Sequence, residues 1–228
     1  MKNKELPKLI CLIGPDGAGK TTQAMLLIKK LKEIGYKYEY KWIRFLHFIS
    51  LPVLALARLM GLTEIQTLPD GKKIGYHYFY KSKLISTLYP LTLFLDMLLA
   101  IIFKIYIPIK IQKKRFVCDR FIYDTLVDLM IDLKNPEFIN SKVAKIFLKL
   151  IPRDCLTILL IAPYEKIKER RIDLKFDKSL RKRVEMYMKL KKKFPQIIVV
   201  DASLDIKSVH KEIWNIVVNS HGTSKAPL

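Results

Sequence analysis

The sequence has little cysteine, little glycine and few acidic residues. It holds three cysteines and eight glycines in 228 residues, and 50% of its residues are hydrophobic. This composition excludes a collagen-like fibre and a disordered chain, and it favours a globular protein with a large buried sheet. There is no Cys-x-x-Cys pair and no histidine at metal-ligand spacing, so we expect a packing role for Cys11, Cys118 and Cys155.

The shortage of acid leaves the chain strongly basic. Its 42 lysines and arginines outnumber 21 aspartates and glutamates, for a net charge of +21. Such a surface attracts polyanions, nucleotides or anionic lipid, and charge alone does not choose among them. The sequence carries no RNA-recognition, helix-turn-helix or zinc-finger signature. We therefore expect solvated helix faces around a phosphate-binding site, and no specific nucleic-acid partner.

Two apolar stretches, 45–62 and 84–111, require a test against membrane insertion. The second is long enough to cross a bilayer. Charges and prolines interrupt it, however, and charges inside a membrane are costly. We therefore favour a core helix or the face of a homodimer, with peripheral membrane contact as the less favoured alternative. The residues that interrupt the stretch 84–111 are Pro90, Asp96, Lys104 and Pro108.

Residues 1–7 have no signal-peptide pattern, so a reducing cytoplasm is the expected location.

Short apolar runs alternate with helix-length segments along the whole chain. This alternation predicts crossover connections and a parallel sheet that is covered on both faces. The predicted fold is a three-layer α/β/α domain over 1–219 with a central, mostly parallel five-stranded sheet. The segment 220–228 has the composition of a flexible tail. The predicted strands are 8–13, 39–45, 115–118, 155–162 and 196–201, and the first predicted helix is 21–34.

A phosphate-binding motif stands between the first predicted strand and the first predicted helix. The spacing G-x-x-x-x-G-K-[ST] is met from Gly14 to Thr21, in the strand-loop-helix context that its chemistry requires. Backbone N–H groups close around phosphate oxygens, Lys20 reaches the β- and γ-phosphates of ATP, and Thr21 coordinates Mg²⁺. The predicted ATP-binding residues are Gly14, Pro15, Asp16, Gly17, Ala18, Gly19, Lys20, Thr21 and Thr22.

The loop sequence GPDGAGKTTQ resembles that of the thymidylate kinase family of P-loop nucleoside monophosphate kinases. The run VCDRF from Val117 to Phe121 resembles the family's Asp-Arg-aromatic motif, and ERR at 169–171 lies where its lid arginines lie. Matches continue through Arg183, Tyr187 and the segment from Val200. The resemblance covers most of the chain and is patchy between residues 45 and 114.

The resemblance implies a role for each matching residue. Asp119 helps to hold Mg²⁺ and the phosphates, and Arg120 holds the phosphate of the acceptor. Asp16 approaches the acceptor's sugar hydroxyl. Since the loop carries Ala18 where some members have an arginine, the charge on the migrating phosphoryl group is expected from a lid at about 164–180. The predicted catalytic residues are Lys20, Asp16, Asp119, Arg120, Arg170 and Arg171.

Several positions that read the acceptor in the family are replaced. Arg44 remains from an Arg-Glu-Pro segment, and the helix around Phe94 lacks the arginine that contacts thymine. We expect acceptor contacts from Asp16, Arg44, Phe94 and Arg120, and metal contacts from Thr21 and Asp119. The family's Ser and Ala-Tyr-Gln positions hold other residues here: Asp124, Val127, Asp128 and Leu129.

Three functional hypotheses follow. The first is ATP- and Mg²⁺-dependent phosphoryl transfer to a nucleoside monophosphate, with dTMP converted to dTDP. The second is a kinase of the same fold that uses a different, amphiphilic acceptor, suggested by the apolar stretch 84–111. The third is a nucleotide-binding module without turnover. Measurement of ADP release with a panel of monophosphates separates the three.

Overall fold

The central sheet of the computed structural model has five parallel strands in the order β2-β5-β1-β6-β7. The structure describes residues 6–44, 47–68, 71 and 73–220. The strands are β1 Leu9–Ile13, β2 Glu39–Trp42, β5 Phe116–Asp119, β6 Cys155–Ile161 and β7 Ile198–Asp201. The predicted five-stranded α/β/α architecture is confirmed, with each strand within a few residues of its expected place. The predicted strand end at 45 and the predicted tail from 221 onward lie outside the described residues.

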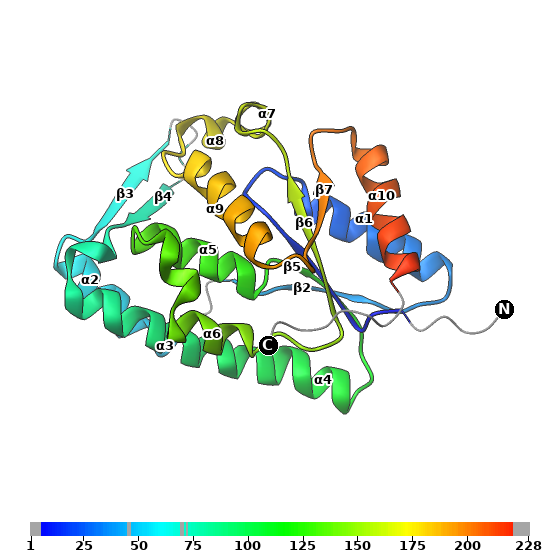
Figure 1. The fold of residues 1–228 in the computed structure, drawn as a ribbon, viewed down its shortest axis with the longest axis horizontal. Coiled ribbons are helices and arrows are strands. Elements are labelled where there is room, and N and C mark those ends of the chain that lie inside the picture. Colours follow the sequence, from blue (N-terminus) through cyan, green and yellow to red (C-terminus); the bar gives the residue numbers. More distant parts are fainter. Residues whose placement is uncertain (1–5, 45–46, 69–70, 72, 221–228) are drawn as a thin grey trace.

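Side chains of β1 alternate between the two faces of the sheet, and each face has its own apolar core. Leu9, Cys11 and Ile13 pack on one side, and Ile10 and Leu12 pack on the other. The second face is covered by α1 Lys20–Glu33 and α10 Ile206–Asn219, which lie side by side in Figure 1. The three cysteines are buried and free, as expected.

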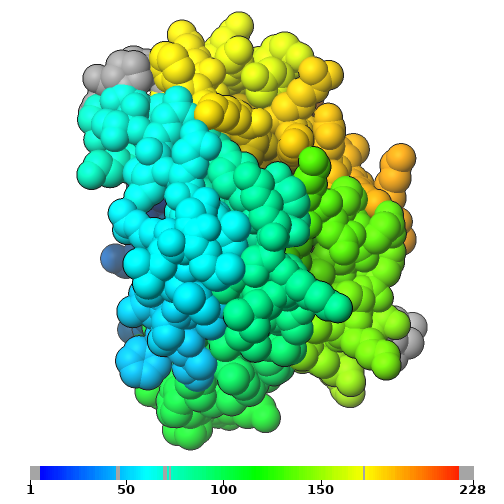
Figure 2. All heavy atoms as spheres, turned by 90° about the vertical axis from the view of Figure 1, so that its left-hand side faces the viewer, coloured from blue at the N-terminus to red at the C-terminus, as the bar shows by residue number. Residues whose placement is uncertain are grey.

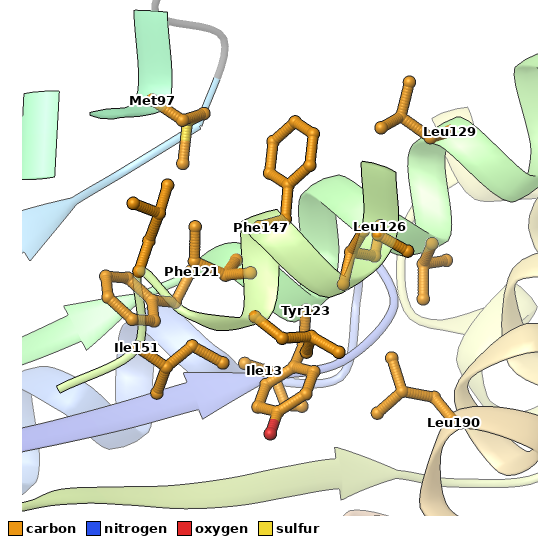
Figure 3. Close-up of a cluster of buried hydrophobic side chains, with 14 of the residues drawn as sticks. Ile13, Met97, Phe121, Tyr123, Leu126, Leu129, Phe147, Ile151 and Leu190 are labelled. Atoms are coloured by element: carbon orange, nitrogen blue, oxygen red, sulfur yellow. The ribbon is translucent and has the colours of Figure 1, made fainter. Parts of the chain in front are cut away.

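The first face carries the larger core, with helices from the middle and end of the chain. Its helices are α3 Lys83–Ile101, α5 Ile122–Asp132, α6 Lys142–Leu148 and α9 Leu180–Lys193. Figure 3 shows Phe121, Tyr123 and Leu126 beside Phe147 and Leu190, with Met97 approaching from α3. Burial of this many large apolar side chains supplies the main driving force for the domain.

A β-hairpin and a short helix stand outside the sheet, and the hairpin lies beside the segment that follows β6. The helix α2 Leu51–Leu59 precedes an antiparallel pair, β3 Thr63–Thr67 and β4 Lys73–His77. The sequence analysis predicted no strand here. Figure 2 shows the hairpin, in cyan, beside the yellow atoms of the segment that follows β6. The described chain also has three short 3₁₀ or π segments: Phe79–Lys81, Ile102–Tyr106 and Pro136–Asn140.

The long apolar helix has two different faces. From Lys83 to Lys110 it runs through α3, the π segment and α4 Ile107–Lys110, and in the described chain it is the single helix whose length and composition would allow a membrane span. The core helix of a soluble protein passes the same test. One face is buried in the core through Ile85, Tyr89 and Leu93. The opposite face exposes Leu84, Leu88, Leu91, Leu95, Leu99 and Phe103.

The lid lies over the loop between β1 and α1. It consists of α7 Tyr164–Glu169 and α8 Ile172–Phe176, which follow β6. Leu174 is buried against the loop at Gly17. At the end of α8, the Tyr76 hydroxyl donates to the backbone oxygen of Phe176 at 3.4 Å and accepts from the backbone N–H of Lys178 at 3.2 Å. The hairpin and the lid are therefore in direct contact.

Candidate active site at the carboxyl edge of the sheet

The phosphate loop has a backbone that requires glycine. Gly14, Gly17 and Gly19 have φ angles of 140°, 81° and 86°, in the region that other residues avoid. A Cβ added to Gly14 would lie 2.2 Å from the backbone oxygen of Leu160, and one added to Gly17 would lie 2.3 Å from Leu174 Cδ1. At Gly14 and Gly17 the loop therefore has space for backbone only, so no side chain at these positions comes between the loop and the oxygens of a ligand.

Lys20 is buried at the start of α1 and folds back over the loop. Its Nζ donates to the backbone oxygens of Gly14 at 2.8 Å and Pro15 at 2.7 Å. Burial, followed by the charge of Arg120, lowers the pKa of Lys20 to about 8. The ammonium group is thus held by carbonyl oxygens that phosphate oxygens can replace.

Thr21 and Asp119 meet across the sheet edge, as a magnesium site requires. The Thr21 hydroxyl donates to Asp119 Oδ2, and the Tyr40 hydroxyl donates to the same oxygen at 3.1 Å. Mg²⁺ prefers oxygen ligands and keeps several waters, so one hydroxyl and one carboxylate beside a phosphate loop fit it. The described residues contain no cluster of three His, Cys, Asp or Glu side chains that would bind a metal without phosphate.

Two arginines converge on Asp16 in the loop. Arg120 Nη2 donates to Asp16 Oδ1, and Arg44 Nη1 lies 3.5 Å from Asp16 Oδ2. Burial opposes ionisation of Asp16, but the charges of Arg120, Lys20 and Arg44 outweigh it and lower the pKa of this carboxyl far below its usual range. Arg120 itself has a left-handed backbone, with φ at 73°. Such strain in a non-glycine residue is typical of functional sites.

A second carboxylate, Asp128 on α5, connects Arg44 to α9. Arg44 Nε and Nη2 donate to the two oxygens of Asp128, each at 2.9 Å, in a bidentate pair. Arg183 of α9 donates to the same carboxylate. Burial would raise the pKa of Asp128, but the two arginines lower it. The sequence analysis assigned neither Asp128 nor Arg183 to the site, because only folding brings them together.

Asp124 links the loop, α5 and α9 beneath these arginines. It is fully buried, and it accepts hydrogen bonds from Gly14 N at 3.2 Å, Phe121 N at 2.8 Å and the Tyr187 hydroxyl at 2.6 Å. Arg120 Nη1 lies 3.6 Å from its Oδ1. Burial raises the pKa of Asp124. At the position of the family's serine, this chain has an anchor for both the loop and Arg120.

The site is divided into three adjoining cavities. The P-loop cavity, of about 420 Å³, is lined by the loop, Asp119, Arg120 and Arg44. The inner cavity, of about 90 Å³, shares Arg44 and adds apolar walls from Leu93, Met97 and Leu129. The outer cavity, of about 490 Å³, borders the inner one. Its side chains come from the hairpin, the end of α5 and the start of α9.

The two lid arginines lie in different places. Arg170 donates to the backbone oxygens of Gly17 and Ala202, so its guanidinium is held against the loop backbone. Arg171 lines the P-loop cavity and pairs with Asp173. Of the two expected lid arginines, Arg171 therefore lines the cavity of the phosphate loop and Arg170 does not.

Phe94 does not line any of the three cavities. Its ring packs edge-on against Phe147, with ring centroids 5.4 Å apart, in the core. Its neighbours Leu93 and Met97 face the inner cavity instead. The sequence analysis also missed Gly75 and His77 of β4, which line the inner cavity and lie in the segment where the family resemblance is patchy.

The remaining predicted site residues are together at one edge. The prediction that Asp119 and Arg120 face the P-loop at the carboxyl end of the sheet is confirmed, since Asp119 pairs in register with Leu12 and hydrogen-bonds Thr21. Parallel sheets bind ligands at this edge. With the phosphate loop after the central strand, the chain is an α/β protein of the P-loop kinase fold.

Comparison with known proteins narrows this class. No protein-family model matches the chain. A protein named "Probable thymidylate kinase" from Pyrococcus horikoshii is 30% identical over 218 residues, covering 91% of this chain and 94% of that one. A similarly named protein of Thermococcus gammatolerans is 28% identical over 228 residues, and a thymidylate kinase of Caldanaerobacter subterraneus is 26% identical over 224. The chain belongs to the thymidylate kinase family.

Proposed function

We propose that this protein transfers the γ-phosphoryl group of ATP, with Mg²⁺, to the phosphate of a nucleoside monophosphate, and that its acceptor is dTMP. One observation carries the proposal: the P-loop cavity and the inner cavity meet at Arg44, with Arg120 beside them. A phosphate bound by these two arginines lies between the ATP site and a pocket for the rest of the acceptor. The names of the relatives support dTMP.

In the proposed reaction, an oxygen of the acceptor phosphate attacks the γ-phosphorus. The bond from the γ-phosphorus to the β,γ-bridging oxygen breaks, so ADP and a nucleoside diphosphate leave. Lys20 contacts the β- and γ-phosphates, and Thr21 with Asp119 would hold Mg²⁺. The metal would neutralise charge on these phosphates. The catalysis is mainly positioning and electrostatic stabilisation.

Binding of the acceptor has to reorganise the charges around Asp16. Arg44 and Arg120 both contact its carboxylate in this structure. A phosphate dianion offers each guanidinium a stronger partner than a shared carboxylate does. Asp16 is then released toward the acceptor's sugar, the role implied by the family resemblance. Arg171 supplies the charge on the migrating group, since the loop itself has Ala18.

The test is ADP release by purified protein with ATP, Mg²⁺ and each of dTMP, dUMP, dCMP, dAMP and dGMP. We expect dTMP to support the fastest turnover. Turnover with none of them would contradict the proposal. It would leave a kinase with another class of acceptor, or a nucleotide-binding module without turnover. The outer cavity favours one alternative, an acceptor that is larger than a nucleoside monophosphate or amphiphilic, because about 490 Å³ extends beyond the inner pocket. ADP release with such an acceptor alone would identify it.

Three further expectations stay predictions. These are the single domain over 1–219, the homodimer and the cytoplasmic location. For the homodimer, the row of exposed leucines on α3 is the face that we propose, since Leu88, Leu91 and Leu95 follow one another at helical spacing. The side of the molecule that contains α2 and α3 is shown in Figure 2.

A further inference from the structure

The last residue of α5, Asp132, stands at the border of two cavities. Its side chain lines both the inner cavity of about 90 Å³ and the outer cavity of about 490 Å³. Three other residues are common to both walls: Gly75, His77 and Arg183. Asp132 therefore faces whatever part of an acceptor lies farthest from the P-loop.

The other charged groups of the inner cavity already have partners. Asp128 is held by Arg44 and Arg183, and Arg44 also pairs with Asp16, so these four groups form one ionic cluster. Within the part of the chain that the structure describes, the Asp132 carboxyl makes no hydrogen bond or ion pair. Burial, followed by repulsion from Asp128, raises its pKa well above the usual range. A carboxyl in this state lacks a donor, and a ligand can supply one.

Three residues on one face of α5 line the inner cavity along its length. Thr125, Asp128 and Asp132 all line the inner cavity, at i, i+3 and i+7 of one helix face. Asp132 is four residues beyond the partner of Arg44, about 6 Å along the helix axis. A phosphate on Arg44 and Arg120 therefore orients the acceptor with its base toward Asp132.

The walls between these two ends suit a flat ring. Leu93 and Met97 of α3 lie on one side and Leu129 of α5 lies on another. His77 is fixed, because its Nδ1 is 3.1 Å from the Thr63 hydroxyl and its ring stacks on Phe79. These apolar walls would contact the two faces of a bound ring, and polar groups at the end of the cavity would hydrogen-bond to its edge.

We propose that Asp132 is the specificity-determining residue for the base, accepting a hydrogen bond from the ring N3–H of thymine or uracil. The inference rests on the proposed function, which supplies the phosphate at the opposite end. It assigns the reading of the base to α5, whereas the family's arginine on the preceding helix is missing here. A neutral carboxyl would also donate its O–H to a neighbouring ring carbonyl, and the raised pKa of Asp132 favours that form.

The experiment compares dTMP with its N3-methyl analogue, which keeps both ring carbonyls and lacks the N3–H donor. We expect the unaltered protein to prefer dTMP by about 10- to 100-fold in kcat/KM, the range for one hydrogen bond to a half-buried carboxyl in a cavity. In Asp132→Ala the preference should fall to about twofold or less, with the KM for ATP unchanged. Asp132→Asn keeps a carbonyl acceptor and an amide donor, so it should restore most of the preference.

Glu185→Ala is the matched control, because Glu185 lines the outer cavity and does not line the inner one. It should leave the preference for dTMP unchanged. An Asp132→Ala protein that folds and still prefers dTMP as strongly as the unaltered protein overturns the inference, while the proposed function stands. Absence of turnover with every monophosphate overturns the proposed function and this inference with it. Thermal unfolding of each variant shows whether it folds. If Asp132→Ala does not fold, Asp132→Leu, which has a similar volume and no polar atom, repeats the test with the same expected loss of preference.

Discussion

The two ends of the proposed site are assembled in different ways. At the ATP end, nine consecutive residues from Gly14 to Thr22 supply the loop, its lysine and its threonine, and one strand adds Asp119. At the acceptor end, Arg44, His77 and Asp132 come from three separate elements. The first end depends on local backbone chemistry, and the second depends on long-range packing. The difference explains how a family can keep its phosphate chemistry while its acceptor pocket changes.

The largest effect is expected from Lys20→Ala, at the ATP end. No other lysine or arginine of the loop reaches the β- and γ-phosphates, so turnover should fall below detection, by more than about a thousandfold. Stopped-flow or coupled ADP assays measure it. Lys29→Ala, on the following turns of α1, is a control that should behave like the unaltered protein. A Lys20→Ala protein with normal turnover would remove this residue from the mechanism.

Arg170 and Arg171 are adjacent in the sequence, but in the lid they have different contacts. Arg171→Ala should lower kcat by about a thousandfold, because Arg171 lines the P-loop cavity and, in the proposed reaction, supplies transition-state charge. Arg170→Ala should lower kcat less and destabilise the lid, because its guanidinium binds the backbone of Gly17 and Ala202. Single-turnover rates and thermal unfolding distinguish the two. Equal and small effects on kcat would show that the lid carries no catalytic charge.

At the acceptor end, the shape of Arg120 is the property to test. Arg120→Lys keeps the charge and loses the planar fork, so the KM for the acceptor should rise by about 10- to 100-fold while the KM for ATP changes little. Steady-state kinetics with each substrate varied in turn provide the measurement. A rise confined to the KM for ATP would place Arg120 on the donor instead.

The smallest predicted effect is a pH dependence at the ATP end. The pKa of Lys20 is lowered to about 8 by burial and by Arg120, so its charge is present below that pH and is lost as the pH rises through it. The Kd for ATP should therefore increase by up to about tenfold per pH unit above pH 8. Titration calorimetry measures this, and AMP, which lacks the β- and γ-phosphates, serves as the control. A Kd for ATP that stays constant up to pH 10 would contradict the assignment.

What could be read from the sequence follows the same division between the two ends. β1, β5 and β6 are nearly continuous apolar runs, so their positions and the parallel arrangement were predictable. The loop was predictable because its glycines and Lys20 are defined by spacing. Both depend on residues that are close together in the chain.

The hairpin and the ionic cluster were not predictable in this way. β3 and β4 have the sequences TEIQT and KIGYH, in which polar residues obscure any strand period, and they pair only with each other. Their position is stabilised by tertiary contacts such as that of Tyr76 with the lid. Asp128 and Arg183 are 55 positions apart in the chain, and nothing in either local pattern indicates the other. Phe94 was expected at the acceptor because of its aromatic side chain, whereas packing against Phe147 turns it into the core.

The most direct test of the central claim is the fate of the γ-phosphate. The protein is incubated with Mg²⁺, dTMP and ATP labelled with ³²P at the γ position, and the products are separated. Transfer across the junction at Arg44 and Arg120 predicts label in the β-phosphate of dTDP, in equal amount to the ADP formed, and none without dTMP. Label that appears only as inorganic phosphate, or ATP that stays intact with dTMP present, would contradict the account.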